Sequence, residues 1–226
     1  MCAASPDRST RAGRRLWDIS PAVDEGSPVF PGDVGFTSTP TFRIGPGCGV
    51  NVAALRLSPH TGAHADAPLH FVPDGTPAGA LDLVPYLGPC RVIQVLGAGA
   101  AVRPADLPTG VLEGAPPRVL FRTYRTQPTA WDPELTALAA ETVELLAAAG
   151  VVLVGTDAAS LDPAASKTLD AHHAAHRGGM AILENLLLDE IEPGDYELIA
   201  LPLRLAGADA APVRAVLREL SREEPR

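Results

Sequence analysis

The sequence is poor in cysteine and in aromatic residues, and it contains no long apolar run. Its three cysteines, Cys2, Cys48 and Cys90, are widely spaced without a C-x-x-C pair, which argues against a disulfide framework or a zinc ribbon. No stretch approaches the roughly 20 apolar residues of a membrane span. The N-terminal arginines precede no apolar segment, so we expect no secretory signal. We expect a solvated tail over residues 1–15 and free thiols in a reducing cytoplasm.

Positive charge is scarcer than negative charge, and several familiar motifs are missing. The net charge of −9 and the isoelectric point near 5.1 argue against a nucleic-acid or anionic-membrane surface. No G-x-S-x-G, G-x-G-x-x-G, Walker or H-E-x-x-H sequence occurs, which disfavours serine α/β-hydrolases, nucleotide-binding proteins and zincins. No repeat or long linker divides the chain, so residues 16–226 are expected to form one catalytic domain.

The histidines are distributed unevenly, in two clusters about a hundred residues apart. Three of the six, with one aspartate, lie between His60 and His70, and the others are His172, His173 and His176. Neutral imidazole and carboxylate oxygen are ligands for zinc or manganese. The composition therefore predicts a site assembled from two distant segments.

The spacing within the first cluster predicts a bent chain. His60, His64, Asp66 and His70 would share one side of a strand, but a straight strand would separate His60 from His64 by roughly 13 Å. Gly62 and Pro68 argue against a continuous helix. We therefore expect a kinked strand or a strand-end loop. A hydrogen-bonded polar turn without an ion is the alternative.

Apolar patterns predict an α/β chain. Strands are expected over residues 16–20, 50–57, 90–96, 119–122, 151–155 and 196–203, and a final strand or short helix over 212–220. Asp132 and Pro133 are typical of a helix start, and the apolar repeat continues to Gly150. A second short helical segment is expected to carry the second histidine cluster, with His172 and His176 on one face.

Three further residues stand out by their surroundings. Glu184 lies in an apolar run, where burial would cost several kcal/mol unless the carboxylate is paired or binds a cation. Asp157 follows a buried strand, where α/β proteins often carry function, although a capping role is the more ordinary interpretation. Phe30 lies in a Pro- and Gly-rich turn and could stack on a ring-bearing substrate or simply fill the core.

Together, these residues predict metal-assisted hydrolysis of an amide or ester. Three imidazoles and two carboxylates exceed what a closed structural zinc site needs and suit two ions that share a water; they are His60, His64, Asp66, His172 and Glu184. Such ions lower the pKa of the water to about 7. His70 remains free to transfer protons.

The stretch SPHTGAHADAPLHF resembles the H-x-G-[TA]-H-x-D-x-P-x-H motif of the metal-dependent cyclase-like hydrolase family. SKTLDAHH with GMAILE is similar to the bacterial kynurenine formamidase (arylformamidase) branch, and the resemblance covers nearly the whole chain after about residue 15. It implies a single-domain swivelling β/β/α fold, with a central mixed, barrel-like sheet flanked by helices. It also implies a cytoplasmic homodimer that hydrolyses N-formyl-L-kynurenine to L-kynurenine and formate in tryptophan degradation.

The resemblance also implies roles for individual residues. His60 and His64 would hold a first zinc ion, His172 a second, and Asp66 and Glu184 would contact both. His70 would donate and accept protons. Phe30 would contact the substrate ring, although the family often has Trp there, and Asn185 stands where Gly is expected.

Three alternatives remain open, and the simplest is a structural protein without metal. A related hydrolase acting on another aryl or cyclic amide, such as isatin, would keep the metals and change the pocket around Phe30. A metal-storage or metal-sensing module would have a closed site and no need for His70. Zinc, manganese and cobalt all suit nitrogen and oxygen ligands.

Overall fold

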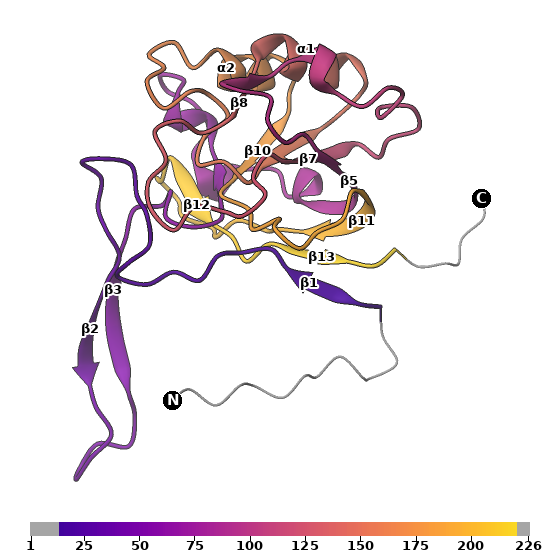
Figure 1. The fold of residues 1–226 in the computed structure, drawn as a ribbon. Coiled ribbons are helices and arrows are strands. Elements are labelled where there is room, and N and C mark those ends of the chain that lie inside the picture. The colour runs from indigo at the N-terminus through magenta and orange to yellow at the C-terminus, as the bar shows by residue number, and fades with distance from the viewer. Residues whose placement is uncertain (1–13, 221–226) are drawn as a thin grey trace.

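The computed structural model describes residues 14–220, so most of the predicted tail lies outside the described residues. The fold is built on one curled, nine-stranded mixed sheet (Figure 1). In order across the sheet, its strands are β1 (Leu16–Asp18), β13 (Val216–Arg218), β11 (Gly194–Ile199), β5 (Leu87–Gln94), β7 (Arg118–Arg122), β9 (Leu153–Thr156), β10 (Ala181–Glu184), β4 (His64–Asp66) and β12 (Ala210–Pro212). This arrangement confirms the predicted α/β class with a central mixed sheet.

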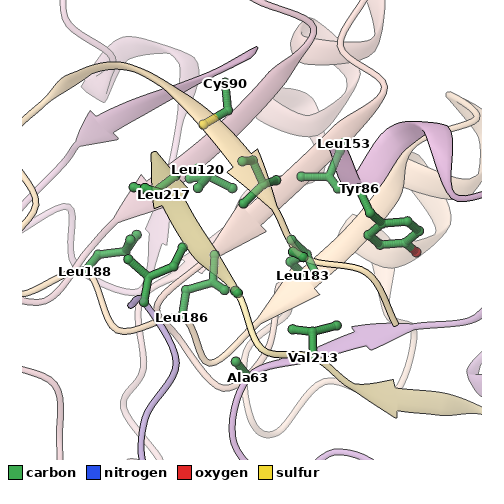
Figure 2. Close-up of a cluster of buried hydrophobic side chains, with 14 of the residues drawn as sticks. Ala63, Tyr86, Cys90, Leu120, Leu153, Leu183, Leu186, Leu188, Val213 and Leu217 are labelled. Atoms are coloured by element: carbon green, nitrogen blue, oxygen red, sulfur yellow. The ribbon is translucent and has the colours of Figure 1, made fainter. Parts of the chain in front are cut away.

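The four central strands, β5, β7, β9 and β10, are parallel, and β7 and β9 are buried on both faces. Their side chains alternate between two apolar clusters, because successive residues of a strand point to opposite faces. Leu120, Leu153 and Leu183 enter one cluster, which Figure 2 shows between the strands. Phe121 and Val154 enter the other, beneath the helices. The sheet is therefore held from both sides.

Two helices, α1 (Ala140–Ala148) and α2 (Asp170–Arg177), lie together on one face of the sheet (Figure 1). Short 3-10 turns complete the connections: η1 (Pro68–His70), η2 (Ala78–Ala80), η3 (Val84–Tyr86) and η4 (Pro104–Asp106). No helix within residues 14–220 combines the length and the apolarity needed to cross a bilayer. Cys48 and Cys90 are free thiols, as predicted, whereas Cys2 lies outside the described residues.

The prediction of a helix starting at Asp132 is wrong. Residues Ala137–Leu138 form strand β8, paired in parallel with β6 (Ala101–Val102), and α1 begins only at Ala140. The Asp132 carboxylate accepts hydrogen bonds from the Glu134 N–H and the Tyr124 hydroxyl. Asp132 therefore stabilises a turn and does not cap a helix. Each of the other predicted strands is present within or close to its range, and the last segment forms strands, not a helix; strands β2, β6 and β10 were not predicted.

A two-stranded hairpin projects from the body of the protein (Figure 1). It consists of β2 (Thr37–Phe42) and β3 (Val52–Arg56), and every residue of both strands is exposed. Its large apolar side chains are also exposed, namely Phe42, Ile44, Val50, Val52 and Leu55. An isolated two-stranded hairpin is marginally stable at best in water.

Candidate metal centre

The first histidine cluster lies on β4 and the turns that flank it. Gly62 has φ +67°, and a Cβ there would approach Val23 Cγ2 to 2.7 Å, so the bend before β4 requires glycine. Pro68 begins η1, which carries His70. Of the predicted kinked strand or strand-end loop, the structure shows the loop: only His64–Asp66 is strand, with His60 in the turn before it and His70 in the 3-10 turn after it. β4 is buried between β10 and β12, which fixes its backbone on both sides.

The pairing of β4 with β10 brings the carboxylates of Asp66 and Glu184 to the same side of the sheet. His64 lies opposite Glu184 and Asp66 opposite Ile182 in the antiparallel register. Because opposite residues of paired strands share a face, His64, Asp66 and Glu184 all point to the helix-covered side of the sheet. Glu184 is the last residue of β10, at the carboxyl end of the parallel strands, where α/β proteins often bind ligands.

His172 reaches the same point from α2. The Asp162 carboxylate accepts hydrogen bonds from the Ala171 and His172 backbone N–H groups, each at 3.0 Å, and contacts His172 Nδ1 at 2.7 Å. This directs His172 Nε2 to within 3.1 Å of Asp66 Oδ2 and 3.3 Å of Glu184 Oε1. The two distant segments therefore meet. Asp162 orients the ring in the way that carboxylates orient metal-binding histidines.

Two buried polar atoms in this centre lack hydrogen-bond partners among the described residues, and they fit a cation. His64 Nδ1 lies 2.9 Å from the Gly62 carbonyl and donates to it, so the neutral ring presents the Nε2 lone pair. That atom faces Asp66 Oδ1 at 3.3 Å, and neither makes a hydrogen bond within the described residues, although His60 Nδ1 lies 3.1 Å from the same Asp66 oxygen. Two acceptors that face each other in a buried site are stabilised by a positive charge between them.

The pKa values of the clustered side chains also indicate that the centre favours positive charge. Burial opposes protonation of His64, but the carboxylates of Asp66 and Glu184 outweigh it and raise its pKa to about 10. Burial disfavours ionised Asp66, yet the His172, His60 and His64 rings outweigh it and hold its pKa well below the usual value. The centre thus attracts positive charge, from protons or from metal ions. Since imidazole ligands must be deprotonated, metal binding would release protons.

The donor geometry allows more than one ion. One ligand atom each from His60, His64 and Asp66 lies within 4.8 Å of the others, and the same holds for Asp66 with His70 and His172. Asp66 belongs to both groups, so its two oxygens can face two ions. All the donors are nitrogen or oxygen, which suits zinc, manganese or cobalt.

Sequence reasoning did not predict Asp209. Its Oδ2 lies 3.1 Å from His60 Nε2 and 3.4 Å from His70 Nδ1, and this aspartate with the two histidines forms a third group of possible ligands. The carboxylate is 44% exposed, so it connects the buried cluster to the exposed His70. No spacing signal marks it in the sequence, because it follows the loop after β11.

A cavity of about 950 Å³ opens onto this centre. His60, His70, His172 and Glu184 line it on one side. Phe30 lies in its wall, 52% exposed, and meets Trp131 edge-to-face with the ring centroids 5.1 Å apart. An open cavity beside the donors is unlike the closed site expected of a metal-storage module. Trp131 was not predicted.

The remaining singled-out residues do not contribute donors to the cluster. The buried Asp157 carboxylate accepts hydrogen bonds from the Thr123 N–H and hydroxyl and from the Tyr124 N–H, and burial raises its pKa to about 6. It therefore holds a loop of the cavity wall, in agreement with the more ordinary interpretation. His173 and His176 contact the Phe71 ring and do not line the cavity.

Comparison with known proteins places this geometry in a family. Residues 17–163 match the model of the Cyclase family, described as "Putative cyclase". The chain belongs to this family. A protein named kynurenine formamidase from Delftia acidovorans is 59% identical over 208 residues, covering 92% of this chain and 99% of that protein. The predicted family resemblance is thereby confirmed.

Solved structures of similar proteins show the same fold. One described as a potential metal-dependent hydrolase with cyclase activity has a TM-score of 0.79 and 27% identity, covering 93% of this chain and 99% of that one. A predicted metal-dependent hydrolase from Bacillus stearothermophilus gives 0.78 and 28%, covering 92% and 100%. An isatin hydrolase bound to thioisatinate gives 0.74 at 20% identity, covering 90% and 91%, and this likeness supports the fold alone.

Proposed function

We propose that the protein hydrolyses N-formyl-L-kynurenine to L-kynurenine and formate, as a cytoplasmic arylformamidase of tryptophan degradation. The observation that carries the proposal is 59% identity to a protein named kynurenine formamidase over 92% of this chain. The cavity beside the buried donors supports an enzyme that admits a small molecule. The isatin-directed alternative has weaker support, because the isatin hydrolase structure is only 20% identical.

We propose a set of metal ligands from the side chains that meet in the cluster. His60 and His64 would hold one zinc ion and His172 a second, while Asp66 and Glu184 would contact both; manganese or cobalt would fit the same donors. When bound, such a pair supplies a water of lowered pKa and polarises the substrate carbonyl. Asp162 fixes the His172 ring so that Nε2 is directed toward the carboxylates.

His70 and Phe30 would act on the substrate directly. His70 is exposed beside the cluster, with its ring centroid 4.3 Å from that of His60. It can donate a proton to the departing aryl amine as the amide bond breaks. Phe30 and Trp131, in contact across the cavity wall, provide an aromatic surface for the anilide ring.

The direct test is hydrolysis of N-formyl-L-kynurenine before and after chelation. We expect formation of L-kynurenine, near-complete loss of activity after the metal is removed, and recovery when zinc is added back, since the water is activated only by bound ions. Elemental analysis of each sample reports the metal content. Undiminished turnover in metal-free protein would contradict the metal assignment. Faster turnover of isatin than of the formamide would contradict the substrate assignment.

We also propose a homodimer in which the β2–β3 hairpin is covered by the second subunit. All residues of its two strands are exposed, including large apolar side chains. Isolated two-stranded hairpins are not stable by themselves, and a second copy of the chain would cover the apolar side chains.

Introducing charge on the hairpin is expected to produce monomers. Burying one large apolar side chain contributes about 1.5–3 kcal/mol, so Ile44→Asp combined with Leu55→Asp should weaken association at least about 100-fold. Sedimentation velocity over a concentration series measures the change. Leu145→Asp, on the exposed surface of α1, is the matched control and should leave the association constant unchanged. An unchanged dimer in the hairpin variant would exclude this interface.

A further inference from the structure

Lys167 is the one lysine of the sequence and the one permanently cationic side chain among the described residues that line the cavity. It is exposed, and it takes part in none of the ion pairs formed within residues 14–220. Apart from the histidine contacts of the metal centre, arginines form those pairs, with carboxylates that do not line the cavity. The Lys167 ammonium is therefore available to a ligand in the cavity.

The backbone around Lys167 is held in place although its side chain is exposed. The Ser166 N–H donates to the Pro163 carbonyl at 2.8 Å, and the Ser166 hydroxyl accepts the Leu169 N–H at 3.0 Å. Leu169 has φ +49°, a left-handed conformation that a leucine adopts only when its surroundings enforce it. At the start of this segment, the Asp162 carboxylate accepts a hydrogen bond from the His172 N–H and contacts His172 Nδ1, which ties the segment to α2. The backbone at Lys167 is therefore held in place relative to the metal centre.

Outside the metal centre, the other charged side chains of the cavity wall are aspartates, and they are already engaged. Each of the following accepts a hydrogen bond from the backbone of a wall loop: Asp24, Asp33, Asp132, Asp157 and Asp189. An anionic group entering this cavity would be repelled by these aspartates unless a cation met it. Outside the metal centre, Lys167 is the lining side chain that can do so.

We propose that Lys167 binds the α-carboxylate of the amino-acid substrate and thereby selects aryl formamides that carry an amino-acid side chain. This inference rests on the proposed function, which supplies a substrate with an aryl formamide at one end and a carboxylate at the other. The formamide occupies the metal centre, and the substrate ring lies against Phe30 and Trp131. The α-carboxylate of the substrate then contacts the ammonium of Lys167. Lys167 is a specificity-determining residue and takes no part in bond cleavage.

The test compares two substrates in the zinc-loaded protein. N-formyl-L-kynurenine carries the carboxylate, whereas N-(2-acetylphenyl)formamide keeps the aryl formamide and ketone without the amino-acid end. Lys167→Met should raise KM for the first by about 10- to 100-fold, the range expected for one charge-assisted hydrogen bond, with little change in kcat. KM for the second should not change. Lys167→Arg should recover most of the loss, because it restores the charge.

A matched control and a second readout separate this inference from the proposed function. Arg177→Met removes one positive charge outside the cavity and should leave both KM values unchanged. Binding of L-kynurenine and of 2-aminoacetophenone, followed by tryptophan fluorescence, does not require turnover. Lys167→Met should weaken the binding of L-kynurenine and leave the binding of 2-aminoacetophenone unchanged.

The possible outcomes are distinct. If the wild-type protein hydrolyses neither formamide, the proposed function fails, and the binding comparison still decides the role of Lys167. The inference is overturned if the wild-type protein does not bind L-kynurenine. It is also overturned if Lys167→Met changes KM equally for the two formamides, or changes the affinity equally for L-kynurenine and 2-aminoacetophenone. The same holds if the substitution changes none of these values.

Discussion

Replacing Asp66 by asparagine is expected to reduce kcat/KM by about 10³-fold or more and to remove most of the bound metal. The two oxygens of this carboxylate face different parts of the cluster, Oδ1 toward His64 and Oδ2 toward His172. An amide of the same shape keeps the packing but loses the charge. Ions of this kind contribute several kcal/mol to the transition state, and each 1.36 kcal/mol is about a tenfold change in rate. Kinetics and elemental analysis of the same samples measure both effects.

Asp209→Asn is the control for the Asp66 substitution. This carboxylate is partly exposed and contacts only His60 and His70 among the clustered side chains, so its loss should cost about 10- to 100-fold, the range for groups that support metal ligands. Asp66→Asn protein that keeps both its metal and its turnover would show that Asp66 is not shared between ions.

His70→Ala is expected to lower kcat by roughly 10²–10⁴-fold while the metal content stays unchanged, because proton transfer typically contributes this much. The defect should shrink for formanilides with a nitro group on the ring, since a less basic amine departs without needing a proton. A series of substituted formanilides measured with both proteins tests this dependence.

His173→Ala is the control for the His70 substitution. His173 contacts Phe71 and does not line the cavity, so the variant should retain the wild-type kcat. Loss of metal from the His70→Ala protein would instead identify His70 as a ligand, a role that its position in two of the donor groups allows.

The convergence of the two histidine segments could be predicted because the sequence leaves little choice for these residues. All six histidines fall into two clusters, and a carboxylate in the apolar run around Glu184 requires a partner once it is buried. Gly62 and Pro68 also marked the bend correctly. These are local signals, and each carries its physical reason in a few neighbouring residues.

What could not be predicted depends on contacts between segments far apart in the chain. Asp209 lies in an alanine-rich stretch, and only the return of the chain to β12 brings it to His60. Trp131 meets Phe30 across a gap of about a hundred residues. The false helix start arose because Leu135 and Leu138 enter separate clusters, which a helical pattern does not reveal.

Strand β4 lies between β10 and β12 in the sheet, so substitutions in its site residues and substitutions in the loops of the cavity wall have different consequences in this fold. His64, Asp66 and Glu184 are borne by mutually hydrogen-bonded strands, so a sequence change that shifts one would disturb its neighbours as well. The aromatic and charged wall opposite is borne by connecting loops, which tolerate substitution and insertion. Descendants of one ancestor can therefore diverge in what they accept while inheriting the same reactive core.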